Sequence, residues 1–264
     1  MGTSDILTPK SARVVAAVKL HRHTGRLRSG RFLAEGPNLV EAAAARGVVD
    51  EVFATAAAAD RYPELLRDMA VTLVTEPAAK ALSDTVTPSG LVAVCRIPDP
   101  QLGSVLAEKP ALIAVAVDLS EPGNAGTLIR IAHAMGAAAV VFAGQSVDPY
   151  NGKCLRSSAG SIFAVPVITE PDTAVLLSQL RSAGLQIVAT TLDGDTSLDD
   201  VGMLAAPTAW VFGPESQGLP EAVTALADHR VLIPMSAGAE SLNVAAAAAI
   251  CLYQSARAQR QSLG

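Results

Sequence analysis

Apolar residues in the second half of the chain form short continuous runs, each followed by a loop of glycine and small polar residues. The first run is ALIAVAVD from Ala111, and AAVVFAG, LQIVATT and TAWVFG come later, with helical patterns between them. Continuous apolar runs of this length are typical of strands buried on both faces of a parallel sheet. They predict a parallel α/β domain over residues 111–264 with right-handed crossovers.

The last such unit is RVLIPMSAGAESLNVAAAAAICLY, which starts at Arg230. We expect a strand at 231–234, a loop of small residues, and a long helix entered through Ser241, Leu242 and Asn243. Serine and asparagine are preferred helix N-caps, so capping alone explains these two side chains. A ligand site at the helix entrance is the other interpretation, and this stretch by itself leaves both open.

The first hundred residues alternate between strand and helix patterns on a smaller scale. SARVVAAVKL has helical spacing, FLAEGPNLVEAAAARG is a strand followed by a helix that Gly47 ends, and strands are expected at 48–55, 71–74 and 91–95. This alternation predicts a small α/β domain over residues 1–97. Residues 98–110 contain several prolines and are expected to be a linker.

The overall charge of −5 conceals a basic segment near the amino terminus. Between Ile6 and Ala34 the chain has seven basic residues and no acidic ones: Lys10, Arg13, Lys19, Arg22, Arg26, Arg28 and Arg31. The segment HRHTGRLRSGRF within it is either an ordinary solvated loop or a surface that meets the phosphates of a polyanion. Such an arm would supply affinity and orientation rather than sequence specificity.

The three cysteines, Cys95, Cys154 and Cys251, are far apart and lie in or beside apolar stretches. Their spacing predicts neither a disulfide framework nor a metal site, so we expect a reduced, cytoplasmic protein. The amino terminus lacks the apolar core of a signal peptide, and no run reaches the roughly 20 apolar residues that span a bilayer.

Three loops after predicted strands combine glycine with polar residues. They are EPGNAG, followed by Arg130; GPESQGL, which starts at Gly213; and the loop from Ile233 to Asn243. Ligands of open α/β sheets bind at the carboxyl ends of the strands, so all three are candidates by position. The first loop is not a GxGxxG dinucleotide fingerprint. Individually, Glu215 could merely favour a helix start and Arg130 could be a solvated charge.

Taken in order, EPGNAGTLIR, GPESQGLP and IPM followed by SLNVAAAAAI closely resemble the three signature motifs of the SpoU family of RNA ribose 2′-O-methyltransferases. The resemblance is strong over about residues 111–257. It is weaker over the first hundred residues, where RFLAEGPNLVEAA resembles the family's substrate-binding domain, which is similar to ribosomal protein L30e. Among relatives, the thiostrepton-resistance type of 23S rRNA methyltransferase is the most similar.

The resemblance implies a Rossmann-like parallel sheet with a deep trefoil knot, the SPOUT fold, and S-adenosylmethionine as the methyl donor. Periodicity and spacing do not indicate a knot, which general topology rules disfavour. In the family the cofactor lies bent in the knot loops, and the residues that correspond to them here are Thr191, Gly213, Gly218, Ile233, Met235 and Leu242. Glycines permit close backbone approach, and the apolar side chains suit the enclosure of adenine.

The implied catalytic residues are Arg130, Asn124, Glu215, Ser241 and Asn243. A ribose hydroxyl must lose its proton as it attacks, and the family assigns this activation to the motif-one arginine. Because arginine is rarely deprotonated in proteins, we interpret Arg130 as an electrostatic clamp on the hydroxyl and the adjacent phosphate. The identity of the base stays open.

RNA-binding residues are expected at Arg22, Arg26, Arg28, Arg31 and Arg156, the last in DPYNGKCLRSSAGSIF, which also resembles the family. The expected partners are RNA, with 23S rRNA as the expected kind, and a second copy of the chain, with no membrane and no metal. Three alternatives stay open: a non-catalytic RNA-binding protein of the same fold, a small-molecule methyltransferase, and an enzyme that acts on tRNA in place of rRNA.

Overall fold

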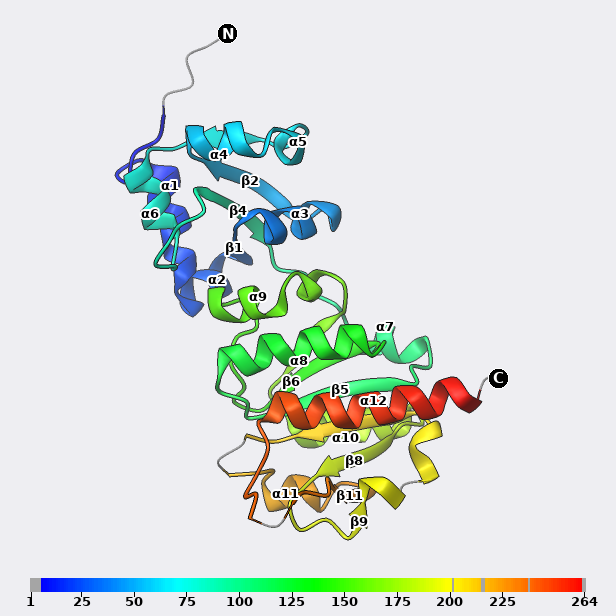
Figure 1. Cartoon of the computed structure of the whole chain (residues 1–264). Helices are drawn as coiled ribbons and strands as arrows, with labels where there is room; N and C mark the ends of the chain where they lie inside the picture. The colour runs from blue at the N-terminus through cyan, green and yellow to red at the C-terminus, as the bar shows by residue number, and fades with distance from the viewer. Residues whose placement is uncertain (1–5, 201, 215–216, 237, 263–264) are drawn as a thin grey trace. The chain divides into compact units, whose positions relative to one another are not determined.

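The computed structural model describes residues 6–200, 202–214, 217–236 and 238–262, and these form two compact units (Figure 1). The first unit comprises Met1–Pro98 and Tyr150–Phe163, and the second comprises Asp99–Pro149 and Ala164–Gly264. The segment from Tyr150 to Phe163 therefore belongs by its contacts to the first unit, although its sequence lies within the predicted methyltransferase domain. The predicted domain boundaries otherwise stay predictions.

A four-stranded sheet forms the centre of the first unit. Its strands are β1 (Arg31–Glu35), β2 (Val49–Ala54), β3 (Val71–Leu73) and β4 (Leu91–Arg96), in the order β1-β4-β2-β3. Strand β4 is antiparallel to both β1 and β2, whereas β3 is parallel to β2. The predicted strands of this half of the chain are therefore confirmed, and the sheet is mixed.

Helices cover both faces of this sheet. They are α1 (Ala12–Val18), η1 (Lys19–His21), α2 (His23–Ser29), α3 (Pro37–Ala45), α4 (Ala56–Arg61), α5 (Pro63–Leu66), α6 (Glu76–Leu82), α9 (Gly152–Ser158) and η2 (Ser161–Phe163). Leucines, valines and alanines of α1 and α6 form one apolar core with the strands. Phe32 of β1 contacts the rings of Tyr150 and Phe163 at centroid distances of 5.0 and 6.1 Å, which anchors the segment that carries α9.

The basic segment after Leu20 is helical, and this corrects the expectation of a loop. Helix α2 runs through Gly25 and ends at Gly30, whose left-handed φ of 62° closes the helix. Arg26 of this helix is only 4 % exposed. Its Nη1 donates to the carbonyl oxygens of Leu20 and His21 at 2.8 and 2.9 Å, so the guanidinium satisfies backbone groups of the preceding turn.

The second unit contains a seven-stranded parallel sheet. Its strands are β5 (Leu112–Val117), β6 (Ala139–Ala143), β7 (Val167–Glu170), β8 (Gln186–Thr190), β9 (Thr196–Ser197), β10 (Thr208–Phe212) and β11 (His229–Leu232), in the order β7-β6-β5-β10-β8-β11-β9. All of the pairings are parallel. The predicted parallel α/β class is confirmed; the trefoil knot stays a prediction.

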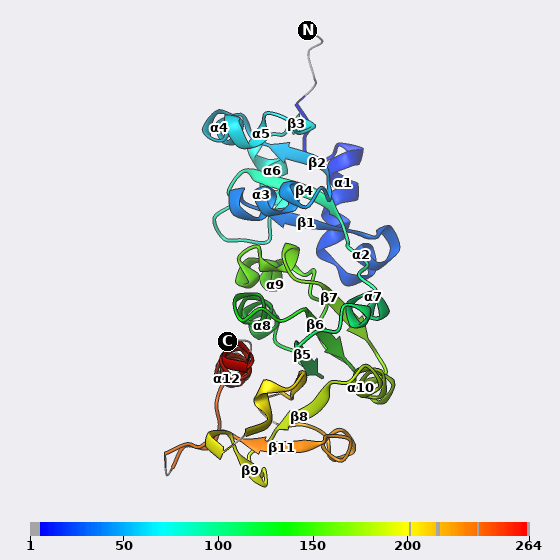
Figure 2. The same ribbon diagram turned by 90° about the vertical axis from the view of Figure 1, so that its right-hand side faces the viewer.

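Helices α8 (Pro122–Ala134) and α12 (Val244–Ser262) lie on one face of this sheet, and α7 (Leu102–Ala107), α10 (Thr173–Ser182) and α11 (Glu221–Thr224) lie on the other (Figures 1 and 2). Two 3₁₀ turns, η3 (Leu198–Asp200) and η4 (Gly202–Ala205), precede β10. Helix α7 falls within the predicted linker. Its Leu102, Val105 and Leu106 pack on the core, which explains a helix where prolines at both ends suggested an extended segment.

None of the helices within the described ranges is long and apolar enough to cross a membrane. The long apolar stretch at the carboxyl end forms part of α12, which is buried through Val244, Ala248, Cys251 and Leu252. Trp210 of β10 donates from Nε1 to Ser255 Oγ of the same helix at 2.8 Å. This buried bond joins α12 to the middle of the sheet.

Candidate functional site

A pocket lies at the carboxyl ends of β8, β10 and β11, where they meet the start of α12. Its walls come from three loops and the first helical turn: Thr190, Thr191, Leu192, Phe212, Gly213, Pro214, Gly218, Val231, Ile233, Met235, Ser241, Leu242, Val244 and Ala247. The cavity measures about 120 Å³. Its lining is mainly apolar, with a few polar groups, which is the usual composition of a small-molecule site.

The loop after β10 is folded tightly against itself. A Cβ at Gly213 would lie 2.6 Å from the backbone nitrogen of Leu219 and 2.7 Å from the carbonyl carbon of Gly218. Gly218, at a φ of 66°, donates its N–H to the carbonyl oxygen of Pro214 at 2.9 Å. Glycine at position 213 is therefore a steric requirement of this loop, because any side chain would collide with backbone.

The loop after β8 is held against β11. Thr191 donates its N–H to the carbonyl oxygen of Val231 at 3.0 Å, and a Cβ at Gly194 would lie 2.6 Å from the backbone nitrogen of Leu232. Arg230 forms an ion pair with Asp193 at 2.8 Å. The hydrogen bond from Arg230, together with its charge, lowers the pKa of the exposed Asp193 carboxyl. These contacts fix Thr191 and Leu192 at the wall of the pocket.

Thr191 contributes an unsatisfied hydroxyl to this wall. Its Oγ1 is buried and makes no hydrogen bond of ordinary geometry, although the hydroxyl is near enough to the Asp193 carboxylate to contribute, as the smallest of the causes, to its lowered pKa. Buried polar groups without a partner are uncommon, and one in a pocket indicates a ligand or water that supplies the missing bond. The pocket therefore has both an apolar surface and a polar group ready for a ligand.

Asn243 occupies the entrance of α12 and makes two kinds of contact. Its Oδ1 accepts from the backbone nitrogens of Ala245 and Ala246 at 2.9 and 3.4 Å, and its Nδ2 donates to Oδ1 of Asn124 at 3.0 Å. Capping and site formation are thus compatible, because one amide group uses its oxygen for the helix and its nitrogen for the other loop. This bond joins residues 119 positions apart in the sequence.

Asn124 lies inside α8 and does not cap it. The N-cap of α8 is Glu121, whose Oε1 accepts from the Gly123 N–H at 3.1 Å. The proline at the first helical position, which needs no N–H partner, moves the helix start to before Asn124. Asn124 therefore lies in the first turn of α8, where its side chain contacts Asn243.

The six predicted cofactor-binding residues all lie in the pocket wall, together with Ser241. Sequence reasoning missed Thr190, Leu192, Phe212, Pro214, Val231, Val244 and Ala247. Their common signal was position at a strand end or in the first turns of α12. Apolar character alone did not separate them from ordinary core residues.

Among the predicted catalytic residues, Asn124 and Asn243 are brought together, and Ser241 lines the pocket. Arg130 is exposed on α8, outside the pocket lining. Glu215 lies outside the described residues. The structure thus assembles part of the predicted catalytic set.

The predicted RNA-binding arginines differ in their surroundings. Arg22 and Arg28 are exposed, whereas Arg31 forms an ion pair with Asp50 at 2.9 Å. Arg156 of α9 is paired with Asp84, and Arg26 is buried, contrary to its expected place in a solvated arm. An RNA-binding role for all five stays a prediction.

Comparison with known proteins identifies the family. Residues 111–253 match the SpoU rRNA Methylase family, and residues 12–93 match the MRM3-like substrate binding domain. The chain therefore belongs to the SpoU rRNA methylase family, as its motifs predicted. It is 34 % identical over 251 residues to the 23S rRNA (guanosine(2553)-2′-O)-methyltransferase RlmP of Bacillus subtilis. The alignment covers 94 % of this chain and 98 % of that protein.

Solved structures agree over almost the whole chain. The SpoU methyltransferase AviRb from Streptomyces viridochromogenes, in complex with AdoMet, has a TM-score of 0.85 and 30 % identity, covering 96 % of this chain and 99 % of AviRb. The AdoMet-bound rRNA methyltransferase from Sinorhizobium meliloti has a TM-score of 0.83 and 26 % identity, covering 96 % and 98 %. Both structures hold S-adenosylmethionine, the cofactor that the motifs implied.

Proposed function

We propose that this protein transfers a methyl group from S-adenosylmethionine to a ribose 2′-hydroxyl of ribosomal RNA. The observation that carries the proposal is the convergence of Thr191, Gly213, Gly218, Ile233, Met235 and Leu242 on one pocket at the carboxyl ends of three strands. Membership of the SpoU family and full-length similarity to an rRNA 2′-O-methyltransferase support it.

The lining of the pocket suits the adenine part of the cofactor. Ile233, Met235 and Leu242 lie in the wall of the cavity of about 120 Å³, and apolar side chains of this kind can pack on the faces of an aromatic ring system. Thr191 Oγ1 offers an unsatisfied polar group beside this apolar surface. S-adenosylmethionine, when bound, would supply an electrophilic methyl group.

The catalytic side chains act on the RNA hydroxyl. Asn243 is rigidly placed because its oxygen caps α12, so its amide nitrogen holds Asn124 in a defined position next to the helix entrance. Arg130 is exposed on the helix that carries Asn124 and is available to the phosphate and hydroxyl of an incoming nucleotide. A fixed positive charge there stabilises the oxygen as it loses its proton. Ser241, in the pocket wall, positions the cofactor or the nucleophile.

The relatives named as 23S rRNA methyltransferases favour 23S rRNA as the substrate, with tRNA as the alternative. The first unit, through exposed Arg22 and Arg28, supplies RNA affinity.

We also propose a cytoplasmic homodimer. Ile250 and Tyr253 on α12, which are 38 % and 49 % exposed, supply an apolar face for it. Gel filtration at micromolar concentration should show a dimer, and a monomer alone would refute that part.

Methyl transfer from labelled S-adenosylmethionine to ribosomal and transfer RNA tests the activity, followed by mapping of 2′-O-methylated positions. The wild-type protein should label one ribosomal position. Arg130→Ala should lose at least hundredfold in kcat while cofactor affinity stays unchanged, because the side chain lies outside the pocket. Full activity of Arg130→Ala would overturn the assignment. Absence of labelling by wild type on every RNA would favour the non-catalytic RNA-binding alternative.

A further inference from the structure

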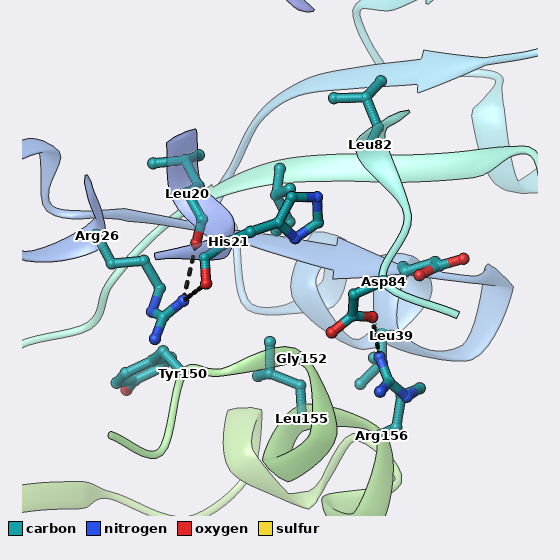
Figure 3. A pocket seen from close by; sticks show the side chains of 12 residues that line it. Leu20, His21, Arg26, Leu39, Leu82, Asp84, Tyr150, Gly152, Leu155 and Arg156 are labelled. Atoms are coloured by element: carbon teal, nitrogen blue, oxygen red, sulfur yellow. Dashed lines mark hydrogen bonds and ion pairs between the residues drawn. The ribbon is translucent and has the colours of Figure 1, made fainter. Parts of the chain in front are cut away.

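A second pocket lies in the first unit and shares no residue with the proposed methyl-transfer site. Its walls are Leu20, His21, Arg26, Leu33, Glu35, Leu39, Leu82, Asp84, Tyr150, Gly152, Leu155 and Arg156, all of which belong to that one unit (Figure 3). The cavity measures about 100 Å³. Leucine side chains and the Tyr150 ring form its apolar walls, and charged groups stand among them.

Glu35 is a residue of the pocket wall, and one of its two carboxylate oxygens has no partner. Its Oε1 accepts from Ser83 Oγ at 2.6 Å and from Thr85 Oγ1 at 3.0 Å. Its Oε2 is buried and has no hydrogen-bond partner. Two hydroxyls thus fix the orientation of the carboxylate, and the remaining oxygen is an acceptor that a ligand donor would satisfy.

The other charged groups limit the ligand to one without net charge. Arg26 donates to two backbone carbonyls in the wall, and Asp84 pairs with Arg156 across the pocket (Figure 3). Gly152 keeps this pair in place, since a side chain there would collide with the Asp84 carboxylate. Two carboxylates and two guanidinium groups balance formally, and the His21 imidazole, also in the wall, has its Nε2 at 3.3 Å from the carbonyl oxygen of Ala81. A phosphate would meet Glu35 Oε2, and an alkyl ammonium would lie among the guanidinium groups, so neither fits well.

A flat, neutral ligand with an N–H group on its edge satisfies these limits. The volume is of the order of one aromatic ring and too small for a whole nucleotide. RNA-binding proteins read sequence mostly from unstacked bases, by hydrogen bonds to base edges beside aromatic or guanidinium groups. We propose that this pocket takes the edge of one unpaired nucleobase of the RNA substrate, whose N–H donates to Glu35 Oε2. This inference rests on the proposed function, because it assigns part of the substrate recognition to the first unit.

Glu35→Gln tests it with little change in shape. The amide oxygen can still accept from Ser83 and Thr85, which turns the amide nitrogen, a donor, toward the ligand N–H. We expect the KM for the RNA substrate to rise about tenfold with kcat and cofactor affinity unchanged. Glu41→Gln, on an exposed position of α3 in the same unit, is the matched control and should leave KM at the wild-type value.

A scan of abasic nucleotides identifies the base. Each substrate fragment carries one abasic site at an unpaired position. One of these fragments should bind the wild type about tenfold more weakly than the intact RNA does. Glu35→Gln should bind that fragment and the intact RNA equally well. The proposal would be overturned if Glu35→Gln kept the KM of the wild type. It would also be overturned if every abasic site weakened RNA binding by Glu35→Gln as much as it weakens binding by the wild type. Absence of methyl transfer by wild type would instead refute the proposed function, so the two failures are distinguishable.

Two further measurements use the wild-type protein and do not depend on a variant that folds. Photocrosslinking of RNA that carries 4-thiouridine at the unpaired positions should label peptides 31–39 or 150–156, and labelling elsewhere only would contradict the pocket. Free uridine and guanosine monophosphates should compete with RNA only at millimolar concentration. Micromolar competition by either would assign the pocket to a free nucleotide, and competition by putrescine would assign it to an amine; both would overturn the proposal.

Discussion

The two pockets have walls of different composition, and we expect them to recognise their ligands in different ways. In the second unit the wall is loop backbone and apolar side chains, with glycine where two backbone segments approach most closely. In the first unit the wall contains two carboxylates and two guanidinium groups held by hydroxyls and carbonyls. The first kind of wall depends on shape, so small steric changes should abolish binding. The second depends on the arrangement of donors and acceptors, so single polar exchanges should change affinity by moderate factors.

The largest effect is expected from a methyl group in the loop after β10. Gly213→Ala brings a Cβ to 2.6 Å from the Leu219 nitrogen, and the loop must shift to relieve the contact. We expect at least a hundredfold loss of S-adenosylmethionine affinity by calorimetry, with RNA affinity retained. Gly103→Ala, in α7, meets nothing within 4 Å and serves as the control. Normal cofactor binding by Gly213→Ala would show that the wall is not set by this close approach.

Asn243 should show a smaller, mixed effect, because its side chain serves helix and site together. Asn243→Ala removes the cap and the bond to Asn124. The free energy of unfolding should therefore fall by about 1–2 kcal/mol, and the rate of methyl transfer should fall as well. Asn243→Asp keeps an acceptor for the helix N–H groups and loses only the donor to Asn124. Thermal unfolding and activity measured on both variants separate the roles. Equal losses of stability would contradict the assignment of the cap to the oxygen.

Stability at alkaline pH should fall in both units, because burial raises the pKa of a thiol in each: Cys95 in the first unit and Cys251 in the second. Burial, with a smaller contribution from the Asp50 charge, raises the pKa of Cys95 in the first unit from the ordinary thiol value of 9.0 to about 12. Above pH 9 the unfolded thiol loses its proton and the folded one keeps it, so the unfolding free energy should fall by about 1.4 kcal/mol per pH unit up to the folded pKa. Urea unfolding of the first unit should show this slope between pH 9 and 10. Cys95→Ala should flatten it; an unchanged slope would assign it to other groups.

The smallest effect is expected at Thr191, where Thr191→Val replaces the unsatisfied hydroxyl by a methyl group of similar size. Cofactor affinity should fall about threefold, the effect of losing one modest hydrogen bond. Stability without cofactor should hold or rise slightly, because a buried polar group without a partner is removed. Thermal unfolding with and without S-adenosylmethionine measures both quantities. Destabilisation of the cofactor-free protein would show that the hydroxyl has a structural partner.

Much of the second unit was predictable because its strands are buried on both faces, so their sequences are continuous apolar runs. Strands β5, β6, β8 and β10 begin and end within a residue or two of prediction. The short β9 and the 3₁₀ turns before β10 carry no comparable signal. The cap of α8, Glu121, was not predicted, and helix α7 was hidden by the prolines around it.

The candidate site was predictable as a set of loops but not as an arrangement. Motif resemblance selected six residues that line one pocket, whereas Phe212 and Val231 looked like ordinary core. The pocket around Glu35 could not be anticipated. Its carboxylate is fixed by Ser83 and Thr85, 48 and 50 residues away, and part of its wall comes from the distant segment with α9.

By itself, the sequence determined the parallel α/β class, the family and the three loops of the cofactor pocket, because periodicity and short motifs are local properties of the chain. Only the tertiary structure decided that Asn243 both caps α12 and holds Asn124, that Arg26 is buried, and that Tyr150–Phe163 packs with the first unit. These outcomes depend on which distant groups become hydrogen-bond partners. A buried polar atom left without one, such as Glu35 Oε2 or Thr191 Oγ1, is recognisable only after the chain has folded around it.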